Sequence, residues 1–142
     1  MSTKASREID IAAPLSAVLE TIADVEALPS WSSLHKKVTV VERTDDGKPK
    51  LVDMSISVMG VNDDQRLEYT WSDDGVTWDL VSGNQQKVQH AVYKLTEKDG
   101  GTHVFFEMEV DLKAPMPGFL VKRGTKSVLD AATEGLSEQV TR

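Results

Sequence analysis

The sequence predicts an α+β fold in which a curved antiparallel β-sheet wraps around one long C-terminal helix, a helix-grip arrangement. Residues 37–112 contain six runs of alternating apolar and polar side chains, the pattern of strands with one buried face. Residues 118–141 then show apolar side chains at helical spacing. A further alternating run and a short helical region precede these elements, so the expected order is strand, two short helices, six strands and helix.

The N-terminal elements follow from local patterns. Arg7–Ala12 alternates at period two and is expected to form the first strand. Pro14 suits the first turn of a helix, and apolar residues recur after it at three- and four-residue intervals. Because a residue before proline is pushed out of the helical region, Leu28–Trp31 is expected to end this helical segment.

The alternating runs define six further strands with one apolar face. They are expected at Lys37–Arg43, Leu51–Val58, Gln65–Trp71, Val76–Leu80, Gln86–Leu95 and Val104–Leu112. The register of Gln86–Leu95 stays open, because Val88, His90 and Val92 compete with Ala91, Tyr93 and Leu95 for the buried face. A helix that begins after Pro117 and runs to about Thr141 must bury its apolar stripe against the sheet. A strongly curved sheet cannot close fully onto a straight helix, so we expect a cavity between the two.

Composition restricts the class of protein. The 142 residues suit one ligand-binding domain over residues 1–142, with 39% hydrophobic and 27% charged residues. The net charge of −7 argues against nucleic acid and anionic membranes as partners. The absence of cysteine excludes disulfides and thiolate metal sites. With no signal peptide and no apolar run of membrane-spanning length, we expect a cytoplasmic protein without a transmembrane segment.

The connections between strands differ at the two ends of the predicted sheet. Every second connection of an up-and-down sheet lies at the same end, and one set is short and polar. The other set includes the wider connections Met59–Asp63 and Ala114–Phe119, which carry large apolar side chains. Unpaired apolar residues on loops often mark a point of entry. The predicted entrance comprises Trp31, Met59, Val61, Met116 and Phe119.

Several segments resemble the polyketide cyclase/dehydrase and lipid transport family, which belongs to the SRPBCC, START-like and Bet v 1-like superfamily. They are Ile11-Ala12-Ala13-Pro14, Pro29-Ser30-Trp31, Val76–Gly83, Tyr93-Lys94-Leu95, Gly101–Val104 and Pro115–Arg123. The resemblance covers nearly the whole chain. It implies a hydrophobic cavity reached between loops and the final helix, in members that range from aromatase/cyclases to plain carriers.

The inward face of the predicted sheet supplies the candidate ligand-binding residues. They are Met54, Ile56, Tyr69, Trp71, Trp78, Tyr93, Phe106 and Met108. Aromatic and methionine side chains make adaptable walls for apolar ligands. The hydroxyls of Tyr69 and Tyr93, when buried, need a partner such as water or a ligand oxygen.

The sequence offers little for catalysis. By strand parity the carboxylates point away from the cavity, and the three histidines are scattered without metal-ligand spacing. We therefore expect no catalytic residue, no cofactor and no metal.

The leading hypothesis is a protein, monomeric or weakly dimeric, that binds or carries a lipid- or polyketide-like hydrophobic small molecule. The alternative is a polyketide aromatase/cyclase-dehydratase in which a tyrosine, His90 or Arg66 assists enolisation and dehydration. A third is a protein-interaction module that uses the exposed apolar loop residues. The identity of the ligand stays open.

Overall fold

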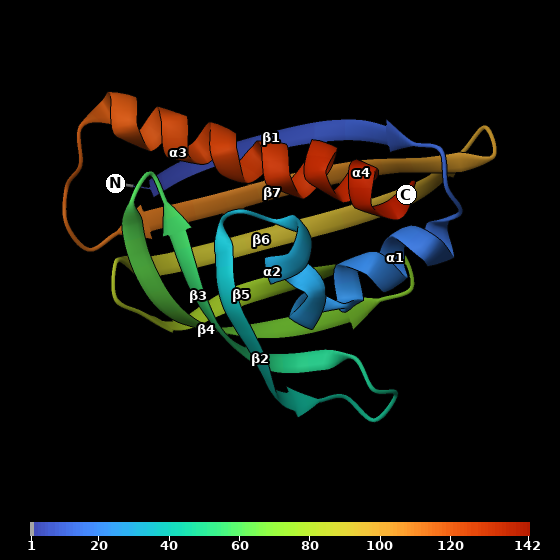
Figure 1. Cartoon of the computed structure of the whole chain (residues 1–142), viewed down its shortest axis with the longest axis horizontal. Helices are drawn as coiled ribbons and strands as arrows, with labels where there is room; N and C mark the ends of the chain where they lie inside the picture. The colour runs from blue at the N-terminus through green and yellow to red at the C-terminus, as the bar shows by residue number, and fades with distance from the viewer. Residues whose placement is uncertain (1) are drawn as a thin grey trace.

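Seven antiparallel strands form one strongly curved sheet in the computed structural model, which describes residues 2–142 (Figure 1). The strands are β1 (Ser2–Ile11), β2 (His35–Arg43), β3 (Pro49–Val58), β4 (Val61–Ser72), β5 (Gly75–Gly83), β6 (Gln86–Lys98) and β7 (Gly101–Leu112). The helical segments are α1 (Leu15–Ala23), the 3-10 turn η1 (Val25–Ala27), α2 (Leu28–Trp31), α3 (Gly118–Asp130), the π-helical turn η2 (Ala131–Gly135) and α4 (Leu136–Val140).

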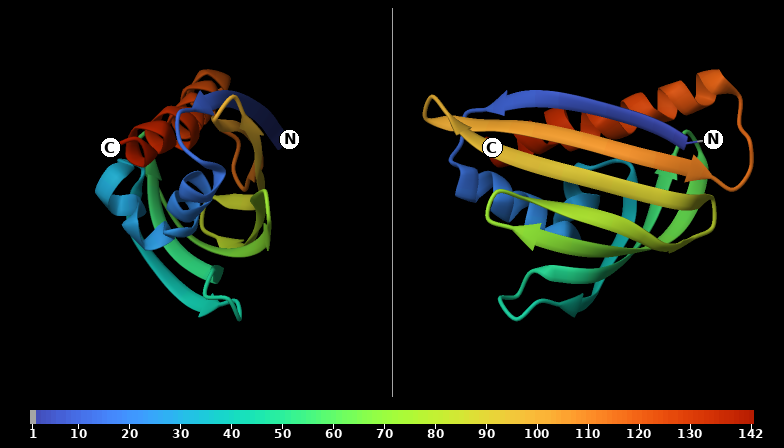
Figure 2. Two further views of the ribbon diagram at one scale, coloured as in Figure 1. Left: turned by 90° about the vertical axis from the view of Figure 1, so that its right-hand side faces the viewer. Right: turned by 180° about the vertical axis from the view of Figure 1, so that it is seen from behind.

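The strand order in the sheet is β1-β7-β6-β5-β4-β3-β2, so β1 is the only strand that leaves sequence order. The sheet curls around α1, α2 and the C-terminal helical segment, as the end-on view shows (Figure 2). The predicted helix-grip fold class is confirmed. None of the helices within residues 2–142 is long and apolar enough to cross a bilayer.

Strands β1 and β4 are longer than their sequence patterns predict. β1 begins at Ser2 rather than Arg7, because β7 supplies backbone partners along its whole length. β4 begins at Val61 because the expected wide connection is a two-residue turn. Met59 and Gly60 form that turn with φ angles of 53° and 79°, the positive values that tight hairpins require.

The N-terminal helical region differs from expectation at Leu28. Leu28 keeps helical backbone angles (φ −48°, ψ −44°), and α2 begins there with Pro29 in its first turn. Proline is tolerated at that point because its missing N–H has no helical acceptor anyway. The C-terminal helix runs without a break from Gly118 to Val140, as predicted, and contains the π-helical turn η2 between α3 and α4.

The structure settles the register of β6. Ala91, Tyr93 and Leu95 face the core, whereas His90 is exposed on the outer face. There its Nδ1 lies 2.6 Å from a carboxylate oxygen of Asp79 on β5. His90 therefore cannot act on a molecule held inside the sheet.

Candidate functional site: a cavity between the sheet and the C-terminal helix

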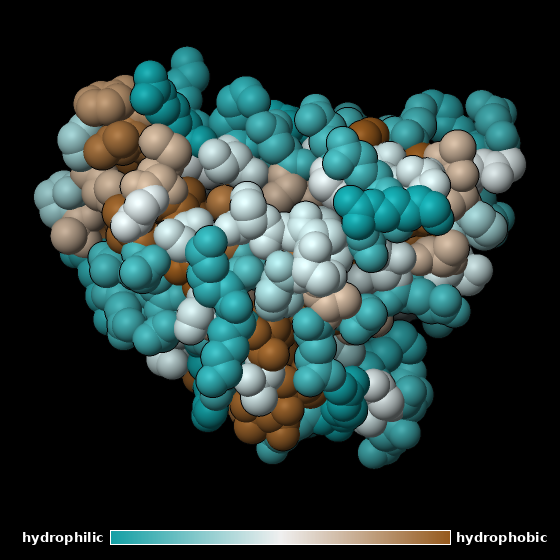
Figure 3. Space-filling view, viewed as in Figure 1, coloured by the Kyte–Doolittle hydropathy of each residue, from teal (hydrophilic) through white to brown (hydrophobic). Residues whose placement is uncertain are grey.

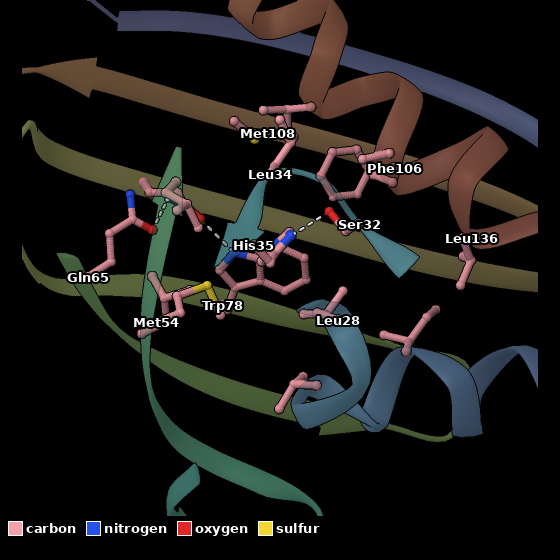
Figure 4. A pocket seen from close by; sticks show the side chains of 18 of the residues that line it. Leu28, Ser32, Leu34, His35, Met54, Gln65, Trp78, Phe106, Met108 and Leu136 are labelled. Atoms are coloured by element: carbon pink, nitrogen blue, oxygen red, sulfur yellow. Dashed lines mark hydrogen bonds between the residues drawn. The ribbon is translucent and has the colours of Figure 1, made fainter. Parts of the chain in front are cut away.

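A cavity of about 130 Å³ lies between the sheet and the C-terminal helix. Its walls come from β3 to β7, from residues 22–35, and from the C-terminal helix at Val128, Ala131, Ala132 and Leu136. Figure 4 shows Gln65 at one end, Leu136 at the other and the Trp78 indole between them. One water needs only about 10–15 Å³ in a cavity, so this space far exceeds a packing defect.

Most of the predicted ligand-binding residues lie together in the cavity wall. Those that line it are Met54, Ile56, Tyr69, Trp78, Tyr93, Phe106 and Met108. Trp71 does not line it. Its ring stacks on Tyr69 at a centroid distance of 6.0 Å, and its Nε1 donates to the carbonyl of Pro49 at 2.6 Å. Trp71 therefore belongs to the core beside the cavity.

Aromatic rings form one continuous side of the cavity. Trp78 lies 5.2 Å from Tyr69, 5.8 Å from Tyr93 and 6.1 Å from Phe106, measured between ring centroids. Tyr93 and Phe106 are 4.8 Å apart. Aromatic pairs at such distances stabilise each other by about 0.5–1.5 kcal/mol beyond their buried area. This side is therefore a rigid apolar surface.

The predicted entrance residues do not lie together. Trp31 lines the cavity, whereas Met59, Val61, Met116 and Phe119 lie outside its lining, towards the end where α3 begins. Figure 3 shows apolar side chains gathered over that end. Of these residues, Met59 is 45% and Phe119 62% exposed. The entrance role of these residues stays a prediction.

The tip of the β3–β4 hairpin approaches α3 closely at Gly124. A Cβ atom at Gly124 would lie 3.2 Å from Cγ1 of Val58, which also lines the cavity. A larger residue at position 124 would have to push the helix and the hairpin apart. The helix and the hairpin are thus in contact beside the cavity.

Apart from the tyrosines, the polar residues in the wall were not predicted, and two of them lie next to α2. Ser32 is buried, and its hydroxyl lies 2.7 Å from Nδ1 of His35 at the start of β2 (Figure 4). Burial lowers the pKa of the His35 imidazole to about 4, so the side chain is neutral near pH 7. Both residues line the cavity where the chain passes from α2 to β2.

A chain of buried amides forms the polar end of the cavity. The indole Nε1 of Trp78 donates to Oε1 of Gln89 at 2.7 Å, and Nε2 of Gln89 donates to Oε1 of Gln86 at 2.7 Å and, more weakly, to Oε1 of Gln65 at 3.3 Å. Nε2 of Gln65 donates to Oδ2 of Asp63 at 2.8 Å. Strand parity alone could have found Gln65, which lies on the same face of β4 as Leu67 and Tyr69.

Asp63 ends this chain as a buried carboxylate. Its Oδ1 accepts hydrogen bonds from the backbone N–H groups of Asn84 and Gln85, at 2.7 and 2.9 Å. Asp63 does not itself line the cavity; it lies behind Gln65. The Asp63 carboxylate of β4 therefore holds Asn84 and Gln85, the connection between β5 and β6, through these two hydrogen bonds.

The two tyrosines differ in hydrogen bonding. Tyr93 donates its hydroxyl to the carbonyl of Ala132 in the π-helical turn at 2.7 Å. Within residues 2–142 the Tyr69 hydroxyl has no hydrogen-bond partner. Burial raises the pKa of both phenols far above 10, with a further contribution from Tyr69 at Tyr93. Both side chains therefore stay protonated and neutral.

Tyr93→Phe is expected to lower the free energy of unfolding by about 1 kcal/mol, because it removes the donor to the Ala132 carbonyl. Tyr69→Phe should change it by less than about 0.5 kcal/mol, because no hydrogen bond is lost. Urea denaturation of the two variants beside the unmodified protein measures both values. Equal losses would contradict this assignment.

Charged groups lie on the outer face of the sheet. Arg66 forms a two-point contact with Asp53, at 2.7 and 2.9 Å, so it does not reach into the cavity. His103 lies between the carboxylates of Asp10 and Glu8, which raise its pKa. No three His, Asp or Glu side chains in the described part of the chain are placed to hold a metal ion.

The polyketide cyclase/dehydrase and lipid transport family matches residues 2–141. The chain belongs to this family. No curated protein matches the sequence.

Solved structures share the fold at low identity. A START superfamily protein from Mycobacterium smegmatis is 20% identical over 97% of both chains, with a TM-score of 0.87. The Zhui aromatase/cyclase from Streptomyces sp. R1128 is 13% identical over 100% of this chain and 95% of its own, with a TM-score of 0.82. Major latex-like protein 151 from Panax ginseng is 14% identical over 90% and 95%, with a TM-score of 0.65. At these identities the likeness establishes the fold alone.

Proposed function

We propose that this family member binds an apolar small molecule in the cavity and carries it unchanged. The observation that carries the proposal is a cavity of about 130 Å³ with one aromatic side and, among residues 2–142, no charged side chain in its lining. Transfer of an apolar ligand from water into such a space is favourable because apolar surface is desolvated.

The volume indicates the size of the part that is bound. A protein cavity of about 150 Å³ lined by apolar side chains accepts a benzene molecule. The cavity therefore suits a single ring or a short chain in its present form. A longer lipid- or polyketide-like ligand would require the helix and the β3–β4 hairpin to separate at Gly124.

The titratable groups in the wall favour carriage over catalysis. They are Tyr69, Tyr93 and His35, and both phenols have strongly raised pKa values. A general base works best with a pKa near the operating pH, whereas burial lowers the pKa of His35 to about 4. None of the three is suited to remove a proton from a ligand near pH 7.

Cumene, a neutral hydrocarbon with one ring, is a direct probe of binding. We expect a dissociation constant on the order of 0.1–1 mM, from the affinity that nine apolar atoms can provide. Amide NMR spectra follow the indole N–H signals of Trp78, in the wall, and Trp71, outside it. A saturable shift at Trp78 with little change at Trp71 is expected, and no shift at Trp78 would contradict binding in this cavity.

Ala132→Leu tests the location of the bound molecule. Ala132 lines the cavity, so a larger side chain there should weaken cumene binding at least tenfold by filling the space. Glu134→Leu, on the exposed side of the same π-helical turn, is the matched control and should bind as the unmodified protein does. Native mass spectrometry of the purified protein can in addition identify a molecule retained from the host.

An aromatase/cyclase-type enzyme is the second candidate, favoured by the His35–Ser32 pair in the wall. In that case His35 would accept a proton from the carbon beside a ligand carbonyl. The exchange of methyl hydrogens of acetophenone in D₂O measures this step. Exchange above the buffer rate that is lost in His35→Gln would support the enzyme; exchange at the buffer rate supports the carrier.

A further inference from the structure

The hydroxyl of Tyr69 is a polar group that the fold leaves open towards the cavity. The residue is 6% exposed and lines the cavity, yet its hydroxyl has no hydrogen-bond partner in the part of the chain that is described. Tyr93 is equally buried, but its hydroxyl already donates a hydrogen bond to the carbonyl of Ala132. A donor that faces the cavity without a protein acceptor is free to bind a ligand acceptor there, which adds a hydrogen bond that the unliganded protein does not make.

The Tyr69 ring is held in place by its neighbours. It stacks between Trp71 and Trp78, with interplanar angles of 18° and 23°. Both indoles are themselves fixed, since each donates its N–H to an oxygen, in Pro49 and Gln89 respectively. The hydroxyl therefore points from a rigid wall, and a ligand must bring its acceptor to that point.

The charge around the cavity disfavours an ionised ligand. No Lys or Arg among residues 2–142 lines it, and the imidazole of His35 is neutral near pH 7. An anion would also approach the buried carboxylate of Asp63, one hydrogen bond behind Gln65. A cation would find no carboxylate in the lining and would lose its hydration.

Building on the proposed function, we propose that the ligand is an uncharged molecule that presents a carbonyl oxygen to the hydroxyl of Tyr69. A carbonyl oxygen accepts the phenolic hydrogen and adds no donor of its own. A ligand hydroxyl would bring a second O–H that needs an acceptor beside the aromatic wall. The ligand class is therefore a neutral ketone or a related carbonyl compound whose bound part is about one ring in size.

Four probes of nearly one shape test this inference. Acetophenone carries the carbonyl, cumene replaces it with hydrocarbon, benzoate adds a negative charge and 1-phenylethylammonium adds a positive charge. Titrations followed at the Trp78 indole signal should show acetophenone binding about tenfold tighter than cumene. The two ions should bind more weakly than cumene. Tighter binding of either ion than of acetophenone would overturn the inference.

Two matched variants assign the preference to one hydroxyl. In Tyr69→Phe the acetophenone affinity should fall about tenfold and become equal to that of cumene. In Tyr93→Phe the ratio between the two probes should persist, because the Tyr93 hydroxyl is already bound to Ala132. A ratio in Tyr69→Phe that matches the unmodified protein would refute the role of Tyr69.

A measurement on the ligand itself reports the hydrogen bond directly. Acetophenone labelled with ¹³C at the carbonyl should show a downfield shift on binding, as a hydrogen-bonded ketone does, and no such shift in Tyr69→Phe. An unchanged carbonyl signal in the bound state would contradict the hydrogen bond. Equal binding of acetophenone and cumene defeats this inference alone, whereas failure of both to bind defeats the proposed function.

Discussion

Phe106→Ala is expected to lower the free energy of unfolding by about 3–5 kcal/mol, the range for a large buried aromatic side chain. Phe106 is 1% exposed and packs between Trp78 and Tyr93. Its loss removes apolar burial and two ring contacts, and it enlarges a space that is already empty. The neighbouring rings are held by their own hydrogen bonds, so they cannot collapse into the gap.

The adjacent residue provides a matched control. Phe105 lies on the opposite face of β7, opposite Glu8 of β1 and Lys94 of β6, and is only partly buried. Phe105→Ala should therefore cost less than half as much. Urea denaturation of both variants at one pH measures the difference. Equal losses would mean that the inner face of β7 is not the main apolar layer.

Acidification is expected to destabilise the protein through His35. Its pKa is about 4 in the folded protein against about 6.5 in an unfolded chain. The unfolded state therefore binds the proton first, so this contribution to stability is present above pH 6.5 and is lost as the pH falls towards 4. The expected loss between pH 7 and pH 4.5 is about 2.5 kcal/mol.

Other groups affect the pH dependence differently. The pKa of His103 is raised by Asp10 and Glu8, so its contribution is present below about pH 6.5 and is lost as the pH rises through its folded pKa. The lowered pKa values of Asp10, Asp53 and Asp130 affect stability only below their ordinary value of 3.8. The window from pH 7 to pH 4.5 therefore separates His35 from the carboxylates.

His35→Gln isolates this contribution. Unfolding free energies at pH 7 and pH 4.5 should differ by about 2.5 kcal/mol less in the variant than in the unmodified protein. His90→Gln, which changes an exposed imidazole, should leave the acid-induced loss in place. If the loss persists in His35→Gln, burial of this imidazole is not its cause.

Much of the cavity wall could be predicted because strand parity is a local property. Tyr69 and Trp78 lie on the inner face since each alternates with polar neighbours along its own strand, and Phe106 shares the strand parity of Val104 and Met108. The same parity places Gln65 and Gln89 on the inner face. The alternation of apolar residues identifies that face, but it does not indicate which polar residues on it line a cavity. Trp71 shares the face of Tyr69 and still lies outside the cavity. Parity assigns a face of the sheet and not a position along it.

The remaining differences arise from contacts between distant segments. His35 and Ser32 reach the cavity because the segment after α2 forms part of its wall, and no pattern in residues 28–35 specifies that path. The open register of β6 was settled by pairing with β5 and β7, which places His90 outside. The π-helical turn coincides with the hydrogen bond from Tyr93 to Ala132, a contact across 39 residues.

The sequence by itself determined the fold class, the strand faces and the apolar character of the interior. The reason is that strand alternation and helical spacing are local patterns, which residues close together in the sequence display. Tertiary structure alone decided where the empty space lies and which polar groups reach it. Those features depend on the distance between the curved sheet and the C-terminal helix, and on which tyrosine hydroxyl forms a hydrogen bond within the protein. Tyr69 and Tyr93 show the same alternating pattern in the sequence, and both are buried. Their hydroxyls nevertheless differ in hydrogen bonding: Tyr93 donates to the C-terminal helix, whereas Tyr69 faces the cavity.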